Sequence, residues 1–394
     1  MLWLAYVSGA FGLAASGQIN FLVPLRAREL GASFEVIGLM VGASAALPAL
    51  VSVMTGAAID RLGARGSFVL GTTATGILAA CSVFVTNYWW YLLLQPVLGV
   101  ARNFGWLASQ AYITGVGTEQ QRHAVAGRFA FFTSAGQMAA PAMIGAVAQL
   151  TGFRWAFLFL TAYSGAFAIV GWLLPPIVRS QKDTELRSGG LGVRSAVQLV
   201  KQRPIQVVLL LSGLRLWITW IYTAFMPIYL VDNGLAPVAV GTVLAMYGIV
   251  GALAAPTTTF WMRFASAPTV GTLAMTGGAL ALILAPHLTA LPLVYLAPVL
   301  IGVSQGVSLP VILAIVGAST PAGQRGVALG LRATINQATA AAGPILVGAL
   351  ISAFGVVAGF TTGGLFAGLL VLSAHVLHRS AGGRTAPETP AGRE

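Results

Sequence analysis

Residues 56–65 read Gly56-Ala57-Ala58-Ile59-Asp60-Arg61-Leu62-Gly63-Ala64-Arg65 and place three charged side chains between two long apolar runs. Charged residues make up only 8% of the chain, so such a cluster is unusual within it. Each flanking run reaches the ~20 apolar residues that a helix needs to cross the ~30 Å hydrocarbon core of a bilayer. The stretch therefore predicts a short turn at a membrane surface, between two membrane-spanning helices.

The composition of the whole chain also indicates a membrane protein. Hydrophobic residues make up 57% of the 394 positions and the mean hydropathy is +0.86, which leaves too little polar surface to coat a water-soluble globule. Apolar runs of roughly 20 residues recur along almost the whole length, and they are continuous rather than alternating as barrel strands would be. We expect an all-α integral membrane protein embedded in a lipid bilayer.

The positive charges indicate which side of the membrane each loop faces. The net charge of +12 comes from basic residues that gather in loops, a pattern that favours membrane topology over nucleic-acid binding. With a cytoplasmic N-terminus, only Arg26, Arg28 and Arg154 fall outside. Fourteen basic residues fall on the cytoplasmic side: Arg61, Arg65, Arg122, Arg179, Lys182, Arg187, Arg194, Lys201, Arg203, Arg263, Arg325, Arg379, Arg384 and Arg393. Both termini are therefore predicted to be cytoplasmic.

Apolar runs and turn signals divide the chain into twelve predicted spans. They lie near 4–25, 36–57, 68–85, 88–113, 125–150, 156–175, 205–231, 238–260, 269–288, 292–316, 327–353 and 355–376. The long polar segment 176–204 separates residues 1–175 from residues 205–378, and we expect it to be a cytoplasmic linker. Residues 379–394 are rich in Gly, Pro and charge, which predicts a disordered tail.

The two predicted six-helix halves align with each other at an offset of 203 residues. The matches fall on residues with strong backbone consequences, which chance alignment of apolar sequence would not supply. The matched pairs are Pro24 with Pro227, Gly31 with Gly234, Gly38 with Gly241, Gly99 with Gly302, Arg122 with Arg325, Gly127 with Gly330, Pro141 with Pro344 and Gly145 with Gly348. We interpret this pattern as an internal duplication.

The charged turn, the duplication and the linker together resemble the major facilitator superfamily of secondary transporters. The turn resembles the loop between helices 2 and 3 of that family through Gly56, Asp60, Arg61, Gly63 and Arg65. The resemblance implies twelve transmembrane helices in two pseudo-symmetric six-helix bundles, with a midplane site between them. It also implies a multi-pass monomer in a bacterial inner membrane, which exchanges a small organic solute with protons or another coupling ion.

The same resemblance gives the charged turn a mechanical role. It implies that Asp60 lies near the positive N-terminal end of helix 11 and latches the cytoplasmic side shut. The alternative is a basic loop that only sets topology. In the second half the offset sends Asp60 to Arg263 and Gly56 to Thr259, so we expect a latch on one half alone.

Helix 5 carries a second family-like motif, formed by Gly127, Gly136, Pro141 and Gly145. It resembles the Gly/Pro motif of drug and metabolite antiporters, although Ala140 stands where a glycine is usual. The alternative is ordinary helix packing, because small residues let helices approach and proline permits bending. Helix 11 carries a similar Gly343-Pro344 and Gly348.

Arginines inside predicted helices point to the substrate site. Arg102 and Arg215 fall near the middle of their helices, and Arg332 about seven residues inside helix 11. A guanidinium at the bilayer centre costs at least ~2.5–3.5 kcal/mol unless water, a partner or a ligand compensates it. None of the nine acidic residues matches their depth, so we expect the arginines to face an aqueous cavity and a substrate anion.

Further polar residues share these helices. Thr219 and Tyr222 continue the stripe of Arg215, with Trp220 beside it, and Asn336 follows Arg332 by one turn. Gln305 is the repeat mate of Arg102. The remaining candidates are Gln18, Asn20 and Gln137, each of which could instead join helices through hydrogen bonds.

Two functions remain open, with efflux as the leading one and transport of an organic anion as the alternative. The helix 5 motif favours efflux of a drug or metabolite by proton antiport, whereas the arginines favour uptake or exchange of a small organic anion. An enzyme is not expected, because no nucleophile, base or metal cluster lies buried at one depth, and we assign no metal or cofactor. ATP is not the expected driving force, since no phosphate-binding loop is present.

Overall fold

The structure is a computed structural model that describes residues 2–114, 122–175, 193–321 and 324–382. Within those ranges the regular elements are all helices, with no β-strand. The first half contains α1 (Leu2–Glu29), α2 (Phe34–Leu50), α3 (Ser52–Leu62), α4 (Ala64–Phe84), α5 (Tyr88–Thr114), α6 (Arg122–Thr151) and α7 (Phe153–Leu173). The span predicted near 36–57 is divided into α2 and α3, which meet at Val51, three residues after Pro48.

The second half begins with the short helix α9. Its elements are α9 (Val193–Val200), α10 (Arg203–Asp232), α11 (Pro237–Ala254), η2 (Ala255–Thr257), α12 (Thr258–Trp261), α13 (Ala267–Leu284), η3 (Ala285–His287), η4 (Leu293–Tyr295), α14 (Leu296–Ser319), α15 (Arg325–Phe354) and α16 (Val356–Gly382). Most of the predicted linker, residues 176–192, lies outside the described residues, and α9 forms inside its last part. The helix α16 continues to Gly382, so the predicted tail from 379 begins within a helix.

The helices have the length and composition of membrane spans. Among the described residues, eight helices are long and apolar enough to cross a membrane, or nine if the bent pair α2 and α3 counts as one span. Large apolar side chains are exposed along them, such as Leu150 at 87% and Leu50 at 80%. Hydrocarbon rather than water suits such a surface, so this is a multi-pass membrane protein. The count of twelve spans stays a prediction.

The predicted duplication is visible in where the helices begin and end. Phe34 and Pro237, Thr151 and Phe354, and Glu29 and Asp232 are helix ends that each differ by 203 positions. The turns between helices repeat as well, because Gly152 and Gly355 both have a positive φ, of 81° and 85°. Only glycine adopts this conformation without strain, so the same turn is built twice.

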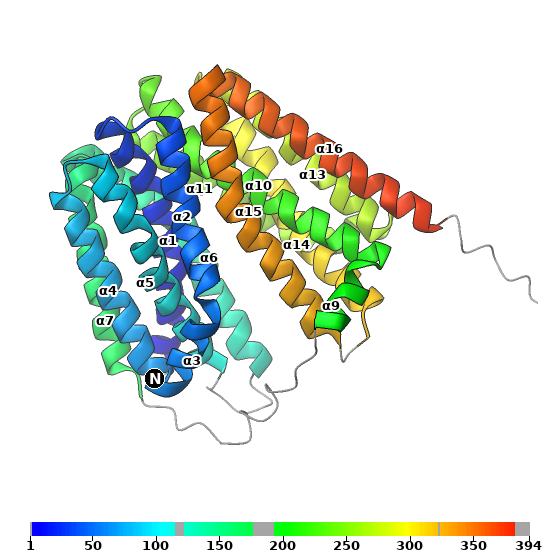
Figure 1. Ribbon diagram of the computed structural model, residues 1–394, viewed down its shortest axis with the longest axis horizontal. Helices are drawn as coiled ribbons and strands as arrows, with labels where there is room; N and C mark the ends of the chain where they lie inside the picture. Colours follow the sequence, from blue (N-terminus) through cyan, green and yellow to red (C-terminus); the bar gives the residue numbers. More distant parts are fainter. Residues whose placement is uncertain (1, 115–121, 176–192, 322–323, 383–394) are drawn as a thin grey trace, which may run out of the picture.

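The two halves lie side by side and meet mainly through three helix pairs. These pairs are α2 with α15, α6 with α11, and α1 with α10. In Figure 1 the halves come together at the upper edge, where α1, α6, α10 and α15 end, and they diverge towards the lower edge, where these helices begin. We call the upper edge the closed end and the lower edge, which holds the N-terminus, the open end.

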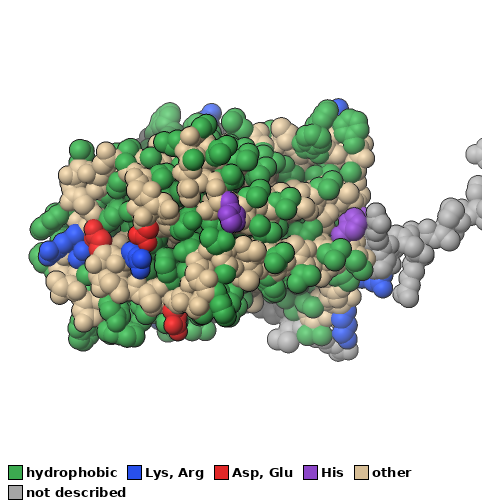
Figure 2. Space-filling model, turned by 90° about the horizontal axis from the view of Figure 1, so that it is seen from above, with side chains coloured by type: hydrophobic (Ala, Val, Ile, Leu, Met, Phe, Trp, Pro, Cys, Tyr) green, Lys and Arg blue, Asp and Glu red, His purple; other side chains and the backbone are tan. Residues whose placement is uncertain are grey.

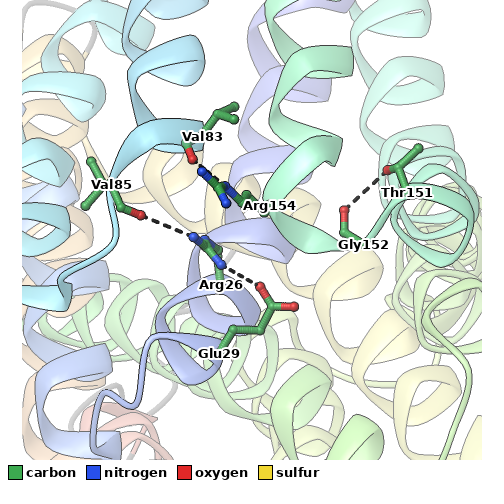
Figure 3. Close-up of polar contacts among 7 residues, drawn as sticks. All are labelled: Arg26, Glu29, Val83, Val85, Thr151, Gly152 and Arg154. Carbon is green, nitrogen blue, oxygen red and sulfur yellow. Dashed lines mark hydrogen bonds and ion pairs between the residues drawn. The ribbon is translucent and has the colours of Figure 1, made fainter.

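Two of the arginines predicted to lie outside hold the first half together at the closed end (Figure 3). Arg26 of α1 pairs with Glu29 at 3.0 Å and donates to the Val85 carbonyl at 3.2 Å. Arg154 of α7 donates through Nε to the Val83 carbonyl at 2.7 Å. Both guanidinium groups therefore bind the end of α4, and their role is structural.

Charged side chains are few on the face of the closed end. Figure 2 shows this face from above, with small groups of Lys or Arg and Asp or Glu amid hydrophobic and uncharged surface. A predominantly apolar molecule with isolated charges at the helix ends fits a protein embedded in lipid.

Candidate functional site

Two helix crossings at the closed end join the halves, and both depend on glycine. A Cβ atom at Gly38 of α2 would lie 2.3 Å from the carbonyl oxygen of Pro344 in α15. A Cβ atom at Gly241 of α11 would lie 2.4 Å from the carbonyl oxygen of Pro141 in α6. Only glycine allows the backbones to touch at these points. Because Gly38 and Gly241 are repeat mates, as are Pro141 and Pro344, the same crossing is built twice.

The glycine motif predicted for the fifth span lies on α6 and takes part in this junction. A Cβ atom at Gly145 would lie 2.5 Å from the Pro237 carbonyl oxygen of the other half. One at Gly136 would lie 2.7 Å from the Ala10 carbonyl oxygen, so this glycine packs α6 on α1 of its own half. Gly127 lies near the start of α6, one turn and a half after Arg122. The motif thus lets α6 pack closely on two sides.

Polar contacts reinforce the crossings at the closed end. The Glu35 amide of α2 donates to Ser352 Oγ of α15 at 2.9 Å. The Val238 amide of α11 donates to Oε1 of Gln149 in α6 at 3.3 Å. In addition, Arg28 of α1 pairs with Asp232 of α10 at 3.1 Å. All three contacts join one half to the other.

A cluster of polar side chains lies in the second half, deeper than the closed-end contacts. Arg215 has Arg332 and Tyr247 as its electrostatic neighbours. The carbonyl oxygen of Arg215 accepts hydrogen bonds from Thr219 Oγ1 at 3.0 Å and from Gln305 Nε2 at 3.1 Å. Four predicted site residues, from α10, α14 and α15, therefore come together, and Tyr247 of α11 joins them.

The first half reaches this cluster through one side chain. Gln137 of α6 lies within hydrogen-bonding reach of the Tyr247 side chain of α11. Both residues lie in the middle of their helices, and both are partly exposed. The contact therefore links the two halves beside Arg215, at a greater depth than the glycine crossings.

Arg102 forms a separate positive centre in the first half. It lies 14 residues after the start of α5 at Tyr88 and 12 before its end at Thr114, close to the middle of the helix. Its Nη1 atom donates to Ser16 Oγ of α1 at 2.5 Å, and Ser16 in turn donates to the Gly12 carbonyl at 2.7 Å. Its charge has a hydroxyl partner but no counter-ion among these contacts.

The charges of Arg102, Arg215 and Arg332 are not neutralised by a carboxylate within the described ranges. Both ion pairs recorded there, Arg26 with Glu29 and Arg28 with Asp232, lie at the closed end. The Nε atom of each of the three arginines is buried without a hydrogen-bond partner. Unpaired buried donors are costly, so these guanidinium groups are prepared for an acceptor that water or a ligand can supply.

Several predicted site residues do not join the cluster through a hydrogen bond. Gln18 is fully buried in α1 with both amide atoms unpartnered, and Tyr222 is fully buried with an unpartnered hydroxyl. Asn336 lies one turn after Arg332, and its Oδ1 is also buried without a partner. A buried amide group without a hydrogen-bond partner costs free energy, so these side chains destabilise the packing of the helices around them.

Asn20 and Trp220 line a small cavity apart from the arginine cluster. Together with Thr223 and Gln95 they surround a cavity of about 10 Å³ between α1, α2, α5 and α10. A space of that size is at the lower limit for a single water molecule and is too small for an organic solute. These two predicted residues therefore lie where α1 and α2 pack on α10, and the structure does not bring them together with the arginine cluster.

Residues 56–62, predicted to be part of a surface turn, instead form the last part of α3, and the chain turns only at Gly63. Gly63 adopts φ of 77° between α3 and α4, and the Arg65 guanidinium donates to the Trp172 carbonyl of α7. A Cβ atom at Gly56 would meet nothing within 4 Å, so no helix approaches closely there. The helix α3, which carries Asp60 and Arg61, packs on α2, α4 and α5 of its own half.

Metal chemistry finds no support in the described ranges, where no group of three or more His, Cys, Asp or Glu side chains could hold an ion. The arrangement is instead that of two helix bundles joined at the closed end. Arg102 and Arg215 lie near the middle of their helices, and neither they nor Arg332 have a carboxylate partner among the described residues. Such a site can bind and release a solute as the bundles move, without bond chemistry.

Comparison with known proteins agrees with this arrangement. A sequence profile described as Major Facilitator Superfamily matches residues 2–312 and 208–393. The chain belongs to the major facilitator superfamily. An uncharacterized MFS-type transporter of Methanocaldococcus jannaschii is 20% identical over 254 residues, which cover 64% of this chain and 65% of that relative. The chain therefore matches slightly less than two thirds of this relative's length.

Solved structures of other members share the fold. The nucleoside transporter NupG has a TM-score of 0.77 and 14% identity, covering 96% of this chain and 99% of that one. A bacterial homologue of the human lysosomal transporter Spinster, inward-facing and occupied, has a TM-score of 0.77 and 17% identity, covering 99% and 98%. The human organic anion transporter MFSD10 has a TM-score of 0.61 and 18% identity, covering 95% and 98%. At these identities the likeness establishes the fold alone.

Sequence reasoning missed two residues of the site region, namely Ser16, which accepts from Arg102, and Tyr247, a neighbour of Arg215. Tyr247 is a single polar side chain within an apolar run, with no polar neighbour one turn away, whereas Ser16 precedes Asn20 by one turn and could have been found from it. The repeat gives no help, because Tyr247 corresponds to Ser44 and has no aromatic twin. The one usable signal for Tyr247 was its depth, because it is a polar residue near the middle of a predicted span.

Proposed function

We propose that this chain is a secondary transporter that moves a small organic anion across the membrane by alternating access. The observation that carries the proposal is the set of three arginines without a carboxylate partner in the described ranges, Arg102, Arg215 and Arg332. Arg215 and Arg332 also repel each other, because each is a cation near the other. A carboxylate or similar group bound between them would remove both the repulsion and the unpaired donors.

The contact between Gln137 and Tyr247 supports a site that senses both halves. Because it joins α6 to α11 beside Arg215, a solute bound at Arg215 would favour or oppose the approach of the halves at that depth. A transporter needs this coupling, since the substrate must change the balance between the two access states.

The state of the transport cycle follows from the proposed orientation. If the N-terminus is cytoplasmic, as the loop charges indicate, the open end faces the cytoplasm and the structure corresponds to an inward-facing state. The organic anions named for MFSD10 support the substrate class only weakly, because the identity is 18%.

Efflux of a drug or metabolite by proton antiport is the second candidate, and the helix 5 motif favours it. The glycines of that motif, which lies on α6, pack this helix against α1 and α11. The repeat-related helix α15 crosses α2 in the same way, so helix packing accounts for the presence of the glycines. The carboxylates of the described residues, Glu29, Glu35, Asp60 and Asp232, all lie at helix ends. A proton relay through a mid-membrane carboxylate therefore lacks its central group, and we favour the anion.

Transport into proteoliposomes tests the proposal. We expect labelled mono- and dicarboxylates to exchange with an unlabelled anion inside, and neutral or cationic solutes of similar size to fail. Arg215→Gln and Arg102→Gln should each lower the initial rate at least tenfold, because a charge-assisted hydrogen bond is worth about 1.5–3 kcal/mol. An imposed pH gradient, applied separately, distinguishes proton coupling from exchange.

Arg128→Gln is the matched control, because Arg128 is an exposed arginine of α6. Its transport should equal that of the unmodified protein. Undiminished transport by both Arg215→Gln and Arg102→Gln would exclude the anion site. The proposed partners beyond the solute are a coupling ion and the bilayer of a bacterial inner membrane, for a protein that acts as a monomer without a cofactor.

A further inference from the structure

The second half has an apolar groove that the transport site does not use. It has a volume of about 570 Å³ and is bounded by residues 206–217 of α10, 335–342 of α15 and 366–377 of α16. Figure 1 shows α10 running between α15 and α16, so α10 forms the floor and the other two helices form the walls. Gln206 and Thr339 are the polar residues of its lining.

On α10 the groove lies on the face opposite Arg215. Its lining residues on α10 include Gln206, Gly213 and Trp217, which recur at helical spacing on one face. Arg215 lies two positions from both Gly213 and Trp217, about 200° around the helix, on the opposite face. The groove lining contains none of the three arginines. On α15, however, Ile335 and Thr339 of the lining follow Arg332 by one and two turns on the same side of the helix, so the groove is a site of its own that borders the arginine cluster.

The groove opens to the lipid side. Phe366 of α16 lines it and is 45% exposed, and Leu369 on the same helix is 62% exposed. On α15, Leu346 follows Ala342 by one turn and is 56% exposed. These side chains continue the groove into an apolar outer face, which in a membrane protein contacts hydrocarbon.

The length of the groove matches one leaflet. From Gln206 to Trp217 the helix rises eleven residues, about 16 Å at 1.5 Å per residue, roughly half of a ~30 Å hydrocarbon core. It begins at the open end, four residues into α10, and stops at the Trp217 indole. That indole is fixed, because its Nε1 donates to the Gly363 carbonyl at 3.0 Å and its ring lies 4.8 Å from the ring of Phe366.

Comparison with the repeat shows how the sequence of the second half differs at this place. At the equivalent place in the first half, α6 packs directly on α1, with Gly136 against the Ala10 carbonyl. The repeat mates of Gly136 and Ala10 are Thr339 and Gly213, and the mate of Trp217 is Ala14. A threonine and a tryptophan thus replace a glycine and an alanine, and these larger side chains hold α10 and α15 apart.

Positive charge lies at the mouth of the groove. Lys201 is exposed just before α10, and Arg203 is the first residue of that helix. The helix α9 packs on both α10 and α15 there, with Val197 and Val200 exposed at 51% and 38%. Residues 193–206 contain three basic residues and no acidic one, which suits the surface of an anionic leaflet.

From these observations we propose that the groove binds one anionic phospholipid from the leaflet at the open end. One acyl chain occupies the groove up to Trp217, and the phosphate lies near Lys201 at its mouth. The bound lipid fills the space between α15 and α16 and so supports the wall of α15, which carries Arg332 on a neighbouring face.

The test measures phospholipid bound to the delipidated full-length protein. Native mass spectrometry with phosphatidylglycerol added at one to two equivalents should show one retained lipid. Ala342→Phe fills the groove and should lower the retained fraction at least fivefold. Ala349→Phe, the same change at an exposed position of α15 outside the groove, should retain lipid as the unmodified protein does.

Two further measurements decide the position of the lipid without relying on the filled variant. Phosphatidylglycerol with a photoactivatable acyl chain, at the same ratio, should crosslink to α10 near Trp217 and to α16 near Phe366. Lys201→Gln should reduce the preference for phosphatidylglycerol over phosphatidylcholine about fivefold, the effect of one lysine near an anionic surface. Crosslinks elsewhere, equal retention by Ala342→Phe, or an equal loss in Ala349→Phe would each overturn the proposal.

Discussion

Ser352 of α15 accepts a hydrogen bond from the Glu35 amide at the start of α2, and the repeat-related pair of residues makes the same contact. The repeat mate of Glu35 is Val238, and the mate of Ser352 is Gln149, which accepts from the Val238 amide. Each half thus caps the first turn of a helix in the other half, whose free amides otherwise lack partners. The contact forms only while the closed end is shut.

Ser352→Ala should therefore weaken the closed end. Loss of one such hydrogen bond costs about 0.5–1.5 kcal/mol, which changes the ratio of the two access states about twofold to tenfold. The change can be measured as the spin–spin distance between labels at Thr86 and Ala290, in closed-end loops of opposite halves. Ser373→Ala is the control, because Ser373 donates only within α16, to Leu369. An equal shift in both variants would contradict this role of Ser352.

Gly241→Ala should prevent the α6–α11 crossing. The added methyl group would lie 2.4 Å from the Pro141 carbonyl oxygen, and a backbone atom cannot move aside as a flexible side chain can. We expect the same labels to report a wider closed end and transport to fall at least tenfold. Gly277→Ala is the control, since a Cβ atom there meets nothing within 4 Å. Normal transport by Gly241→Ala would show that the halves need not touch at this point.

The pair Gln137 and Tyr247 should show energetic coupling. Tyr247→Phe and Gln137→Leu remove the same contact between the halves, so their effects on substrate affinity should not add. A double-mutant cycle, measured by thermal stabilisation with a transported anion, should give a coupling energy of about 0.5–1.5 kcal/mol. Tyr295→Phe removes a hydrogen bond to Thr242 within one half and serves as control. Additive effects would mean that the contact does not link substrate to the movement of the halves.

Asp60→Asn tests the latch that family resemblance assigns to the charged turn. The latch would act when the open end is shut, so its loss should favour the state with that end open. A charge near a helix end contributes about 0.3–1 kcal/mol, which predicts a shift of up to about fivefold. Labels at the open end of the two halves can measure it. Unchanged distances and transport would leave the turn with a role in topology alone.

Much of the fold could be predicted because its causes are local. Apolar run length requires helices that cross a bilayer, and Gly63 permits the sharp turn between α3 and α4. The offset of 203 residues predicted matching helix ends, such as Phe34 and Pro237, since duplicated sequence folds in the same way twice. The deep positions of Arg102 and Arg215 also follow from counting residues along a helix.

The candidate site could be predicted only in part, because contacts between helices depend on rotation and tilt. Sequence reasoning named Gln137 but not its partner Tyr247, which lies 110 positions away in the other half. It also named Asn20 and Trp220, which line a cavity of about 10 Å³ between α1, α2, α5 and α10, a position that depends on how these helices pack. A polar residue at the right depth can face a cavity or a neighbouring helix, and the helix itself does not decide which.

By itself, the sequence determined the membrane-spanning helices, their duplication and the depth of the arginines, because hydrophobicity and helical rise act along the chain. The tertiary structure alone decided which repeat-related residues meet. Gly38 touches Pro344 and Gly241 touches Pro141 because two copies of one bundle pack about a pseudo-twofold relation, so each copy contacts the complementary part of the other. The same packing paired Glu35 with Ser352 and opened a groove in one half, where Trp217 replaces the small side chain of Ala14.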